Sequence, residues 1–272
     1  MKTAQLAALL AALGLAAGCI ESKTVYSVKK DGSGTVLIED YLTPQMTGMM
    51  DSMAQQMNAA AGGNANADVA APKQSNMFQA QIDGRCQQIG GDLKLISQQT
   101  VTNATGWKGY RAVFAFKNIA ALKVPGSNMD AEPSDPSEKK ETQPAYSFQF
   151  TPGAKPTLKI VPSPKSKNAA PAKEEDPMAA QMAATMMGSM LKGARNTIIV
   201  EVEGDISNTN AKYVNGKRQV VLIDVPIDKL ATNPDAMKII TTKSPDQQEK
   251  LSKLTLPGVQ VEDPTKTISI TY

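Results

Sequence analysis

Apolar and polar residues alternate in several segments of this chain, and this pattern constrains the fold more than any other feature. The alternating segments are 146–150, 198–202 and 268–272. Successive side chains of a β-strand point to opposite faces, so each segment predicts a strand with one buried face and one wet face. More continuously apolar runs predict central strands, and they lie near 36–42, 110–116 and 220–225.

Short turn sequences separate neighbouring predicted strands. The turns are Asp31-Gly32-Ser33-Gly34, the stretch 103–106, Thr151-Pro152-Gly153 and Asn215-Gly216. Gly and Asn adopt the positive φ angles that tight hairpins need. The strands paired in this way are 24–30 with 34–42, 92–101 with 107–117, 146–150 with 157–161, and 206–214 with 217–225. The sequence therefore predicts a largely antiparallel sheet built from hairpins.

Helix starts are marked by a capping side chain followed by proline. Such pairs are Thr43-Pro44, Asp176-Pro177, Asn233-Pro234 and Ser244-Pro245, the last with Gln247 completing a capping box. A further apolar set at helical spacing comprises Phe78, Ile82, Cys86 and Ile89. Strands and helices in this mixed order predict the α+β class rather than a doubly wound parallel sheet.

Methionine is concentrated on two of the predicted helices. One set is Met46, Met49, Met50, Met53 and Met57, and the other is Met178, Met182, Met186 and Met190. Each set forms one apolar helix face. Methionine fills irregular gaps, so the leading interpretation packs both faces on the sheet. An adaptable face for a protein partner or lipid is the second interpretation, and soft-metal binding by thioethers is the third.

The N-terminus has the pattern of a bacterial lipoprotein signal. Lys2 precedes an Ala- and Leu-rich run over 4–17, which is shorter than the roughly 20 residues that span a bilayer. The sequence Ala16-Ala17-Gly18-Cys19 resembles a lipobox, with Leu15 one position further from the cysteine than usual. That resemblance implies cleavage after Gly18 and a fatty-acylated, palmitate-bearing Cys19, which anchors the chain to a membrane.

The expected location is the cell envelope. Ile20 rather than Asp follows Cys19, and in Gram-negative sorting this resembles an outer-membrane destination, facing the periplasm or the cell surface. We therefore expect a signal peptide over 1–18 and a single α+β domain over 19–272. Flexible, Pro-, Lys- and Ala-rich loops are predicted near 58–74, 125–144 and 162–176.

Missing residue types exclude several chemistries. The chain has 0 histidines and 2 cysteines, which removes the commonest general base and any thiolate metal cluster. Its net charge is +3 with cations and anions interleaved, which argues against a nucleic-acid partner. Cys86 is predicted to be a buried, inert thiol, and Glu201 and Glu203 to be solvated charges. No enzyme activity, cofactor or metal is expected.

Three segments resemble uncharacterised bacterial lipoproteins with an LppM-like domain. They are 28–36 (VKKDGSGTV), 106–119 (GWKGYRAVFAFKNI) and 195–230. The resemblance implies an antiparallel α+β domain in the cell envelope and brings no catalytic residues. The expected function is a membrane-anchored, non-catalytic lipoprotein that binds a protein partner or a lipid-like ligand. A structural or assembly lipoprotein is the alternative, with soft-metal binding less favoured.

Overall fold

The computed structural model describes residues 21–44, 47–48, 52, 74–125, 144–163, 193–231, 233, 235–236, 239 and 247–272. The predicted signal peptide, Gly18, Cys19 and both methionine sets lie outside the described residues. Most of the three predicted loops lies outside them as well.

The larger of two sheets has eight strands. They are β1 (Glu21–Val28), β2 (Gly34–Leu42), β3 (Lys94–Thr102), β4 (Lys108–Phe116), β8 (Arg195–Val202), β10 (Val214–Asn215), β11 (Gln219–Pro226) and β12 (Gln260–Val261). Their order is β10-β11-β8-β1-β2-β4-β3, with β12 paired to β11. The pairings are antiparallel except for β1 with β8, whose register aligns Glu21 with Arg195 and Val28 with Val202.

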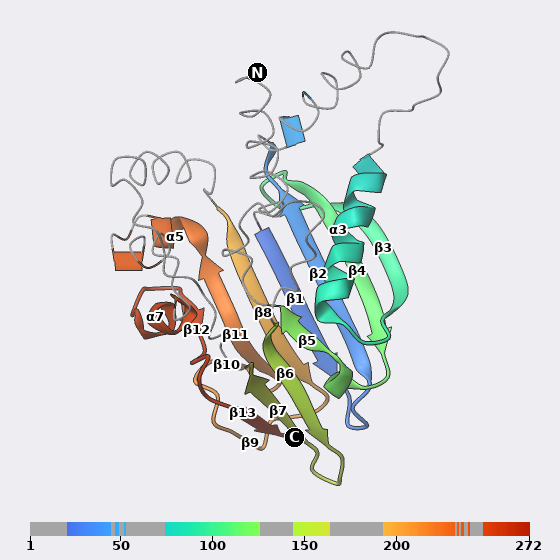
Figure 1. Cartoon of the computed structure of the whole chain (residues 1–272), viewed down its shortest axis with the longest axis vertical. Coiled ribbons are helices and arrows are strands. Elements are labelled where there is room, and N and C mark those ends of the chain that lie inside the picture. The colour runs from blue at the N-terminus through green and yellow to red at the C-terminus, as the bar shows by residue number, and fades with distance from the viewer. Residues whose placement is uncertain are drawn as a thin grey trace, which may run out of the picture.

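The smaller sheet has five strands and is antiparallel throughout. They are β5 (Lys123–Pro125), β6 (Pro144–Thr151), β7 (Thr157–Pro162), β9 (Asn208–Thr209) and β13 (Ile268–Thr271), in the order β5-β6-β7-β13-β9. In Figure 1 this sheet overlaps the lower part of the large one, and the chain's C-terminal end lies beside it.

One hydrophobic core joins the two sheets. Tyr26 and Val200 of the large sheet are fully buried in it, as are Ile160 and Ile270 of the small sheet. The rings of Tyr26 and Phe148 lie 5.2 Å apart, centre to centre. The inward-facing residues of both sheets therefore form a single apolar layer, as in a β-sandwich.

Helices cover only part of the same inner face. Helix α3 (Gln74–Ile89) lies beside β5 and over β4, and it buries Phe78, Ile82 and Ile89 at the predicted helical spacing. A short 3-10 helix, η1 (Ile119–Ala121), precedes β5, and α5 (Ile227–Ala231) and α7 (Gln247–Lys253) follow β11. Among the described residues, no helix is both long and apolar enough to cross a membrane.

The expected α+β class, with methionine-rich helices packed on one antiparallel sheet, is wrong. The described chain is a β-rich fold of two sheets, and the second sheet occupies much of the inner face that helices were expected to cover. The physical reason is that an alternating strand has one apolar face that packs equally well on a helix or on another sheet. The pattern predicted most of the longer strands but not β5 or β12, and it did not assign the strands to separate sheets.

Most predicted hairpins are confirmed. The turn between β1 and β2 is held by Asp31, whose carboxylate accepts hydrogen bonds from the backbone and hydroxyl of Ser33 at 2.9 and 2.7 Å. The turns between β3 and β4 and between β6 and β7 are also as predicted. The predicted 206–214 with 217–225 hairpin is wrong in part, because only β10 pairs with β11 while β9 joins the small sheet.

Candidate functional site

A hollow of about 640 Å³ lies on the face of the large sheet that is turned away from the small one. Its floor is formed by three neighbouring strands, β1, β8 and β11. Because Tyr26 faces the core, the alternate residues of β1 face the hollow, and the register places Lys23 beside Thr197 and Asp224. The first described residue, Glu21, also lines the hollow, so the site lies at the start of β1.

An Arg–carboxylate pair crosses the hollow between β8 and β11. Arg195 Nε and Nη2 donate to the two carboxylate oxygens of Asp224 at 2.6 and 2.7 Å. The Thr197 hydroxyl adds a third hydrogen bond to Asp224 at 3.3 Å. The hydrogen bonds that Arg195 donates to the Asp224 carboxylate raise the pKa of Arg195 above its ordinary value. Three hydrogen bonds thus fix the position of the Asp224 carboxylate between β8 and β11.

The wall of the hollow comes from the segment between β9 and β10. Lys212 Nζ lies 4.8 Å from the centre of the Tyr213 ring, a cation–π contact that holds both side chains at the rim. Apolar contributions are limited to Ile199, Val221 and Val214. The mixture of cations, carboxylates and an aromatic ring suits an open site that recognises a polar or charged surface rather than one that encloses an apolar molecule.

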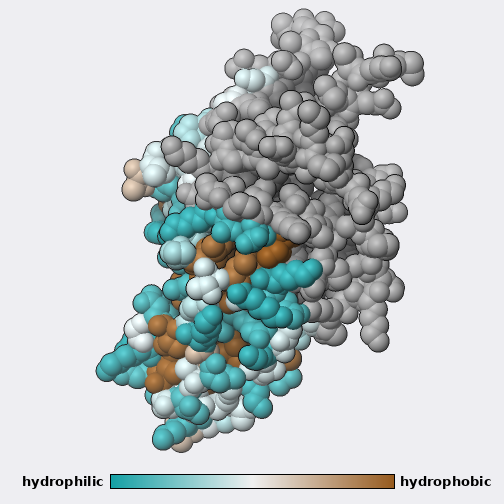
Figure 2. All heavy atoms as spheres, turned by 90° about the vertical axis from the view of Figure 1, so that its left-hand side faces the viewer, coloured by the Kyte–Doolittle hydropathy of each residue, from teal (hydrophilic) through white to brown (hydrophobic). Residues whose placement is uncertain are grey.

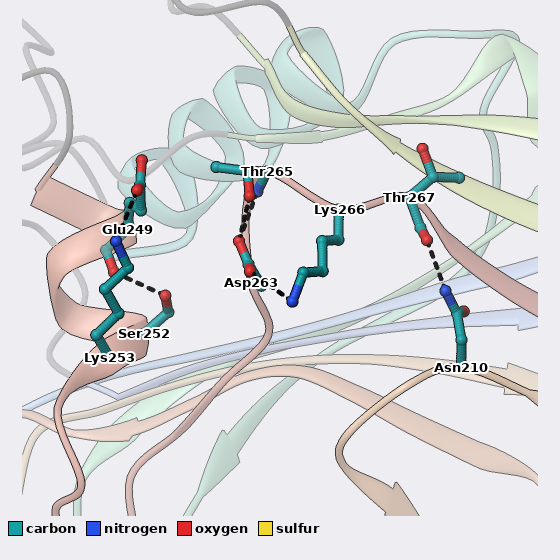
Figure 3. Close-up of polar contacts among 8 residues, drawn as sticks. All are labelled: Asn210, Glu249, Ser252, Lys253, Asp263, Thr265, Lys266 and Thr267. Atoms are coloured by element: carbon teal, nitrogen blue, oxygen red, sulfur yellow. Dashed lines mark hydrogen bonds and ion pairs between the residues drawn. The ribbon is translucent and has the colours of Figure 1, made fainter.

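A smaller hollow, of about 210 Å³, lies where α7 meets the connection from β12 to β13 (Figure 3). Asp263 accepts hydrogen bonds from the backbone and hydroxyl of Thr265 and pairs with Lys266 at 3.2 Å. The Thr265 hydrogen bonds lower the pKa of Asp263 to about 2. On α7, Lys253 pairs with Glu249 one turn earlier. The two carboxylates drawn in Figure 3, Glu249 and Asp263, both pair with neighbouring side chains. We therefore interpret this hollow as a structural contact between α7 and the β12–β13 connection rather than as a binding site.

Glu262 fastens this region to the large sheet. Its side chain is only 4% exposed, and one carboxylate oxygen accepts the backbone N–H groups of Lys212 and Tyr213 at 2.7 and 2.8 Å. Burial raises the pKa of Glu262, although the two hydrogen bonds oppose that effect. The sequence pattern predicted neither the strand that precedes Glu262 nor the burial of its side chain.

A second buried acid lies under α3. Asp40 is 1% exposed and accepts a hydrogen bond from the Tyr110 hydroxyl. Arg85 of α3 approaches the same carboxylate at 3.7 Å and donates to the hydroxyls of Ser22 and Thr24 at 2.9 and 3.1 Å. The cluster ties α3 to β1, β2 and β4 by polar contacts.

The predicted site residues lie outside the described residues, so the structure does not test them. Gly18 and Cys19 come directly before it, and the methionine sets lie outside it. Cys86 is half-buried and free, and burial raises the pKa of its thiol, as predicted for an unreactive cysteine. Glu201 and Glu203 make separate hydrogen bonds, to Gln219 and to the backbone of Lys30, and do not form a carboxylate pair.

Sequence reasoning missed the Arg195–Asp224 pair and the hollow it crosses. The two residues lie 29 positions apart in the sequence. Arg195 starts β8 and Asp224 lies near the end of β11, and the antiparallel pairing of these strands brings the two residues together. No group of three or more Asp, Glu or Cys side chains in the described part of the chain is arranged to hold a metal ion. Figure 2 shows hydrophobic residues on the β10–β12 side as small patches between hydrophilic ones.

No family model, curated relative or solved structure matches this chain.

Proposed function

We propose that this protein is a lipid-anchored lipoprotein of the bacterial cell envelope, tethered through Cys19, that binds an envelope partner or a lipid-like ligand without catalysis. The observation that carries the proposal is the N-terminal sequence, in which a short apolar run ends at Gly18-Cys19. The outer membrane, with the domain facing the periplasm or the cell surface, is the proposed location because Ile20 follows the cysteine.

The position of β1 supports a functional anchor. Strand β1 begins at Glu21, two residues after Cys19, and lies between β2 and β8. Two extended residues span about 7 Å, at roughly 3.3–3.6 Å each. An acylated Cys19 would thus hold a central strand of the large sheet, rather than a long linker, at the bilayer.

The hollow supports the binding part of the proposal. It includes Glu21 and Lys23 of β1, so an anchored domain would present it within a few residues of the membrane. Its charged rim suits polar surfaces, such as a lipid headgroup or an envelope protein. The chain has no histidine to act as a general base, and Asp224 accepts hydrogen bonds from Arg195 and Thr197.

The anchor is tested by metabolic labelling with palmitate and by membrane fractionation. We expect label in the full-length chain, and neither label nor membrane retention in Cys19→Ser. Cys86→Ser is the matched control, because it removes the other cysteine, and it should behave like the natural chain. If Cys19→Ser stays in the membrane fraction as fully as the natural chain, the proposed anchor is wrong.

A structural or assembly role is the second candidate, and the exposed edge strand β3 favours it. Leu95 and Ile96 are 47% and 59% exposed, and β3 pairs with β4 alone among the described strands. Unpaired strand edges accept further strands, and an added lysine blocks them. Ile96→Lys should abolish any crosslinked assembly seen in cells if β3 carries it, while Gln149→Lys, on an exposed position of β6, should not.

A further inference from the structure

We infer that the end of the sandwich at the 103–107 turn is a bilayer-contacting surface, with Trp107 at the lipid headgroup level. The inference rests on the proposed anchor at Cys19. Trp107 is the single tryptophan of the chain. It lies at the end of the large sheet where β1 starts, next to the first described residue.

Direct contacts place this turn beside the start of β1. Asn103 Nδ2 donates to Glu21 Oε2 at 2.8 Å, and Glu21 is two residues after Cys19. The same asparagine holds the turn through its side-chain oxygen, which accepts the backbone N–H of Trp107 at 2.8 Å. Two extended residues span about 7 Å, so a lipid on Cys19 would hold this end of the large sheet, and the turn bonded to Glu21, towards the bilayer.

Trp107 is positioned by its neighbours rather than enclosed by them. Its ring lies beside Gly193, where an added Cβ would be 3.1 Å from a ring carbon. Gly193 is itself exposed, and Trp107 is half-buried. Tryptophan concentrates at membrane interfaces because its ring is apolar while its N–H prefers a wet, polar environment.

The 103–107 turn differs in charge from the turns at the opposite end of the large sheet. The 103–107 turn, Asn-Ala-Thr-Gly-Trp, has no charged side chain. At the opposite end, the described turns carry Lys29, Lys30, Asp31, Glu203, Asp205, Lys217 and Arg218. Two charged groups near the turn already have partners: Glu21 accepts a hydrogen bond from Asn103, and Arg195 donates to Asp224. Lys108, next to Trp107, carries a positive charge that anionic lipid headgroups attract. Removing water from the 103–107 turn at a membrane interface therefore costs less free energy than removing it from those charged turns.

The single tryptophan allows a direct test with the full-length chain. The protein is extracted from host membranes and reconstituted into phosphatidylcholine–phosphatidylglycerol vesicles, with or without bromine on the acyl chains near the headgroups. Bromine quenches only nearby indoles, so we expect about a twofold loss of Trp107 fluorescence in the brominated vesicles and a blue-shifted emission maximum. The matched control is Trp107→Phe/Lys30→Trp, which places the indole at the exposed opposite end, about 25 Å away along eight strand residues. It should keep its fluorescence.

Mass spectrometry of the N-terminal peptide separates the two proposals. If Cys19 is acylated and the vesicles carry the protein, an unquenched Trp107, or equal quenching of the indole at position 30, overturns the bilayer-contacting surface while the anchor stands. If Cys19 carries no lipid, both proposals fall. Unchanged circular dichroism of the double variant shows that its fold is kept.

Discussion

Two buried tyrosines illustrate how residue-scale contacts connect the sheets. Tyr26 and Tyr146 are both fully buried. The Tyr26 hydroxyl donates to the carbonyl oxygen of Lys123 at 2.9 Å, which links β1 of the large sheet to β5 of the small one. The Tyr146 hydroxyl has no hydrogen-bond partner among the described residues. For both tyrosines burial raises the pKa well above 10, so neither ionises at neutral pH.

Replacing each tyrosine by phenylalanine should therefore have different effects. Tyr26→Phe removes the donor that bonds to the Lys123 carbonyl, and we expect a loss of about 1 kcal/mol in the free energy of unfolding. Tyr146→Phe removes a hydroxyl that is already unpartnered and should be neutral or stabilising. Urea denaturation of both variants measures the difference, and an equal loss in the two would contradict this account.

Glu262 predicts a pH dependence of stability. Burial raises its pKa in the folded state above the value in the unfolded chain. The stability that goes with protonated Glu262 is present below the unfolded pKa and is lost as the pH rises through the folded pKa. Glu262→Gln keeps an acceptor for the backbone N–H groups of Lys212 and Tyr213 and carries no charge.

The melting temperatures of Glu262→Gln and the natural chain should be similar near pH 4 and should separate as the pH rises to 7, with the variant higher. The gap should not exceed about 4 °C, the shift that about 1 kcal/mol produces in a domain of this size. Glu203→Gln, which changes an exposed carboxyl, is the control. A natural chain that gains stability over the variant between pH 4 and 7 would show that the hydrogen bonds outweigh burial.

At the scale of elements, the β1–β2 hairpin depends on a glycine at the first residue of β2. A Cβ on Gly34 would lie 1.9 Å from the carbonyl oxygen of Ser27 and 2.7 Å from the ring of Phe116. Neither neighbour can move without separating paired strands. Only a residue without a side chain fits between β1 and β4 at this point.

Gly34→Ala should cost about 2–3 kcal/mol, the range typical of overpacked positions, and should lower the yield of folded chain. Gly153→Ala is the matched change in the β6–β7 turn, where an added Cβ would meet no atom within 4 Å. It should be neutral. Thermal unfolding of both variants measures the difference in stability. Equal melting temperatures would contradict the prediction that only Gly34→Ala is destabilising.

The hairpins could be predicted from sequence because local chemistry decides them. Asp31 and Asn103 each fold back on their own turn, and such contacts depend on neighbouring residues only. The assignment of strands to two sheets depends on distant partners. Nothing local distinguishes β7, which pairs with β13 from the far end of the chain, from a strand of the large sheet. For the same reason Arg195 and Asp224 could be recognised as surface charges but not as partners.

At the scale of the whole molecule, the continuous core predicts cooperative unfolding. Buried residues of both sheets and of α3 belong to one cluster, so neither sheet has a separate core. We expect a single transition with coincident midpoints when urea unfolding is followed by Trp107 fluorescence, which reports on the large sheet, and by far-UV circular dichroism. Two separated midpoints would show that the sheets unfold independently.

The parallel pairing of β1 with β8 has a consequence for biogenesis. These neighbours are separated by 166 residues between Val28 and Arg195, and β8 in turn separates β1 from β11. A chain delivered from its N-terminus through a translocon cannot close the middle of its sheet until about three quarters of it has emerged. In the export that we propose, the first hairpin would until then expose the unpaired edge of β1, to which chaperones of the envelope can bind.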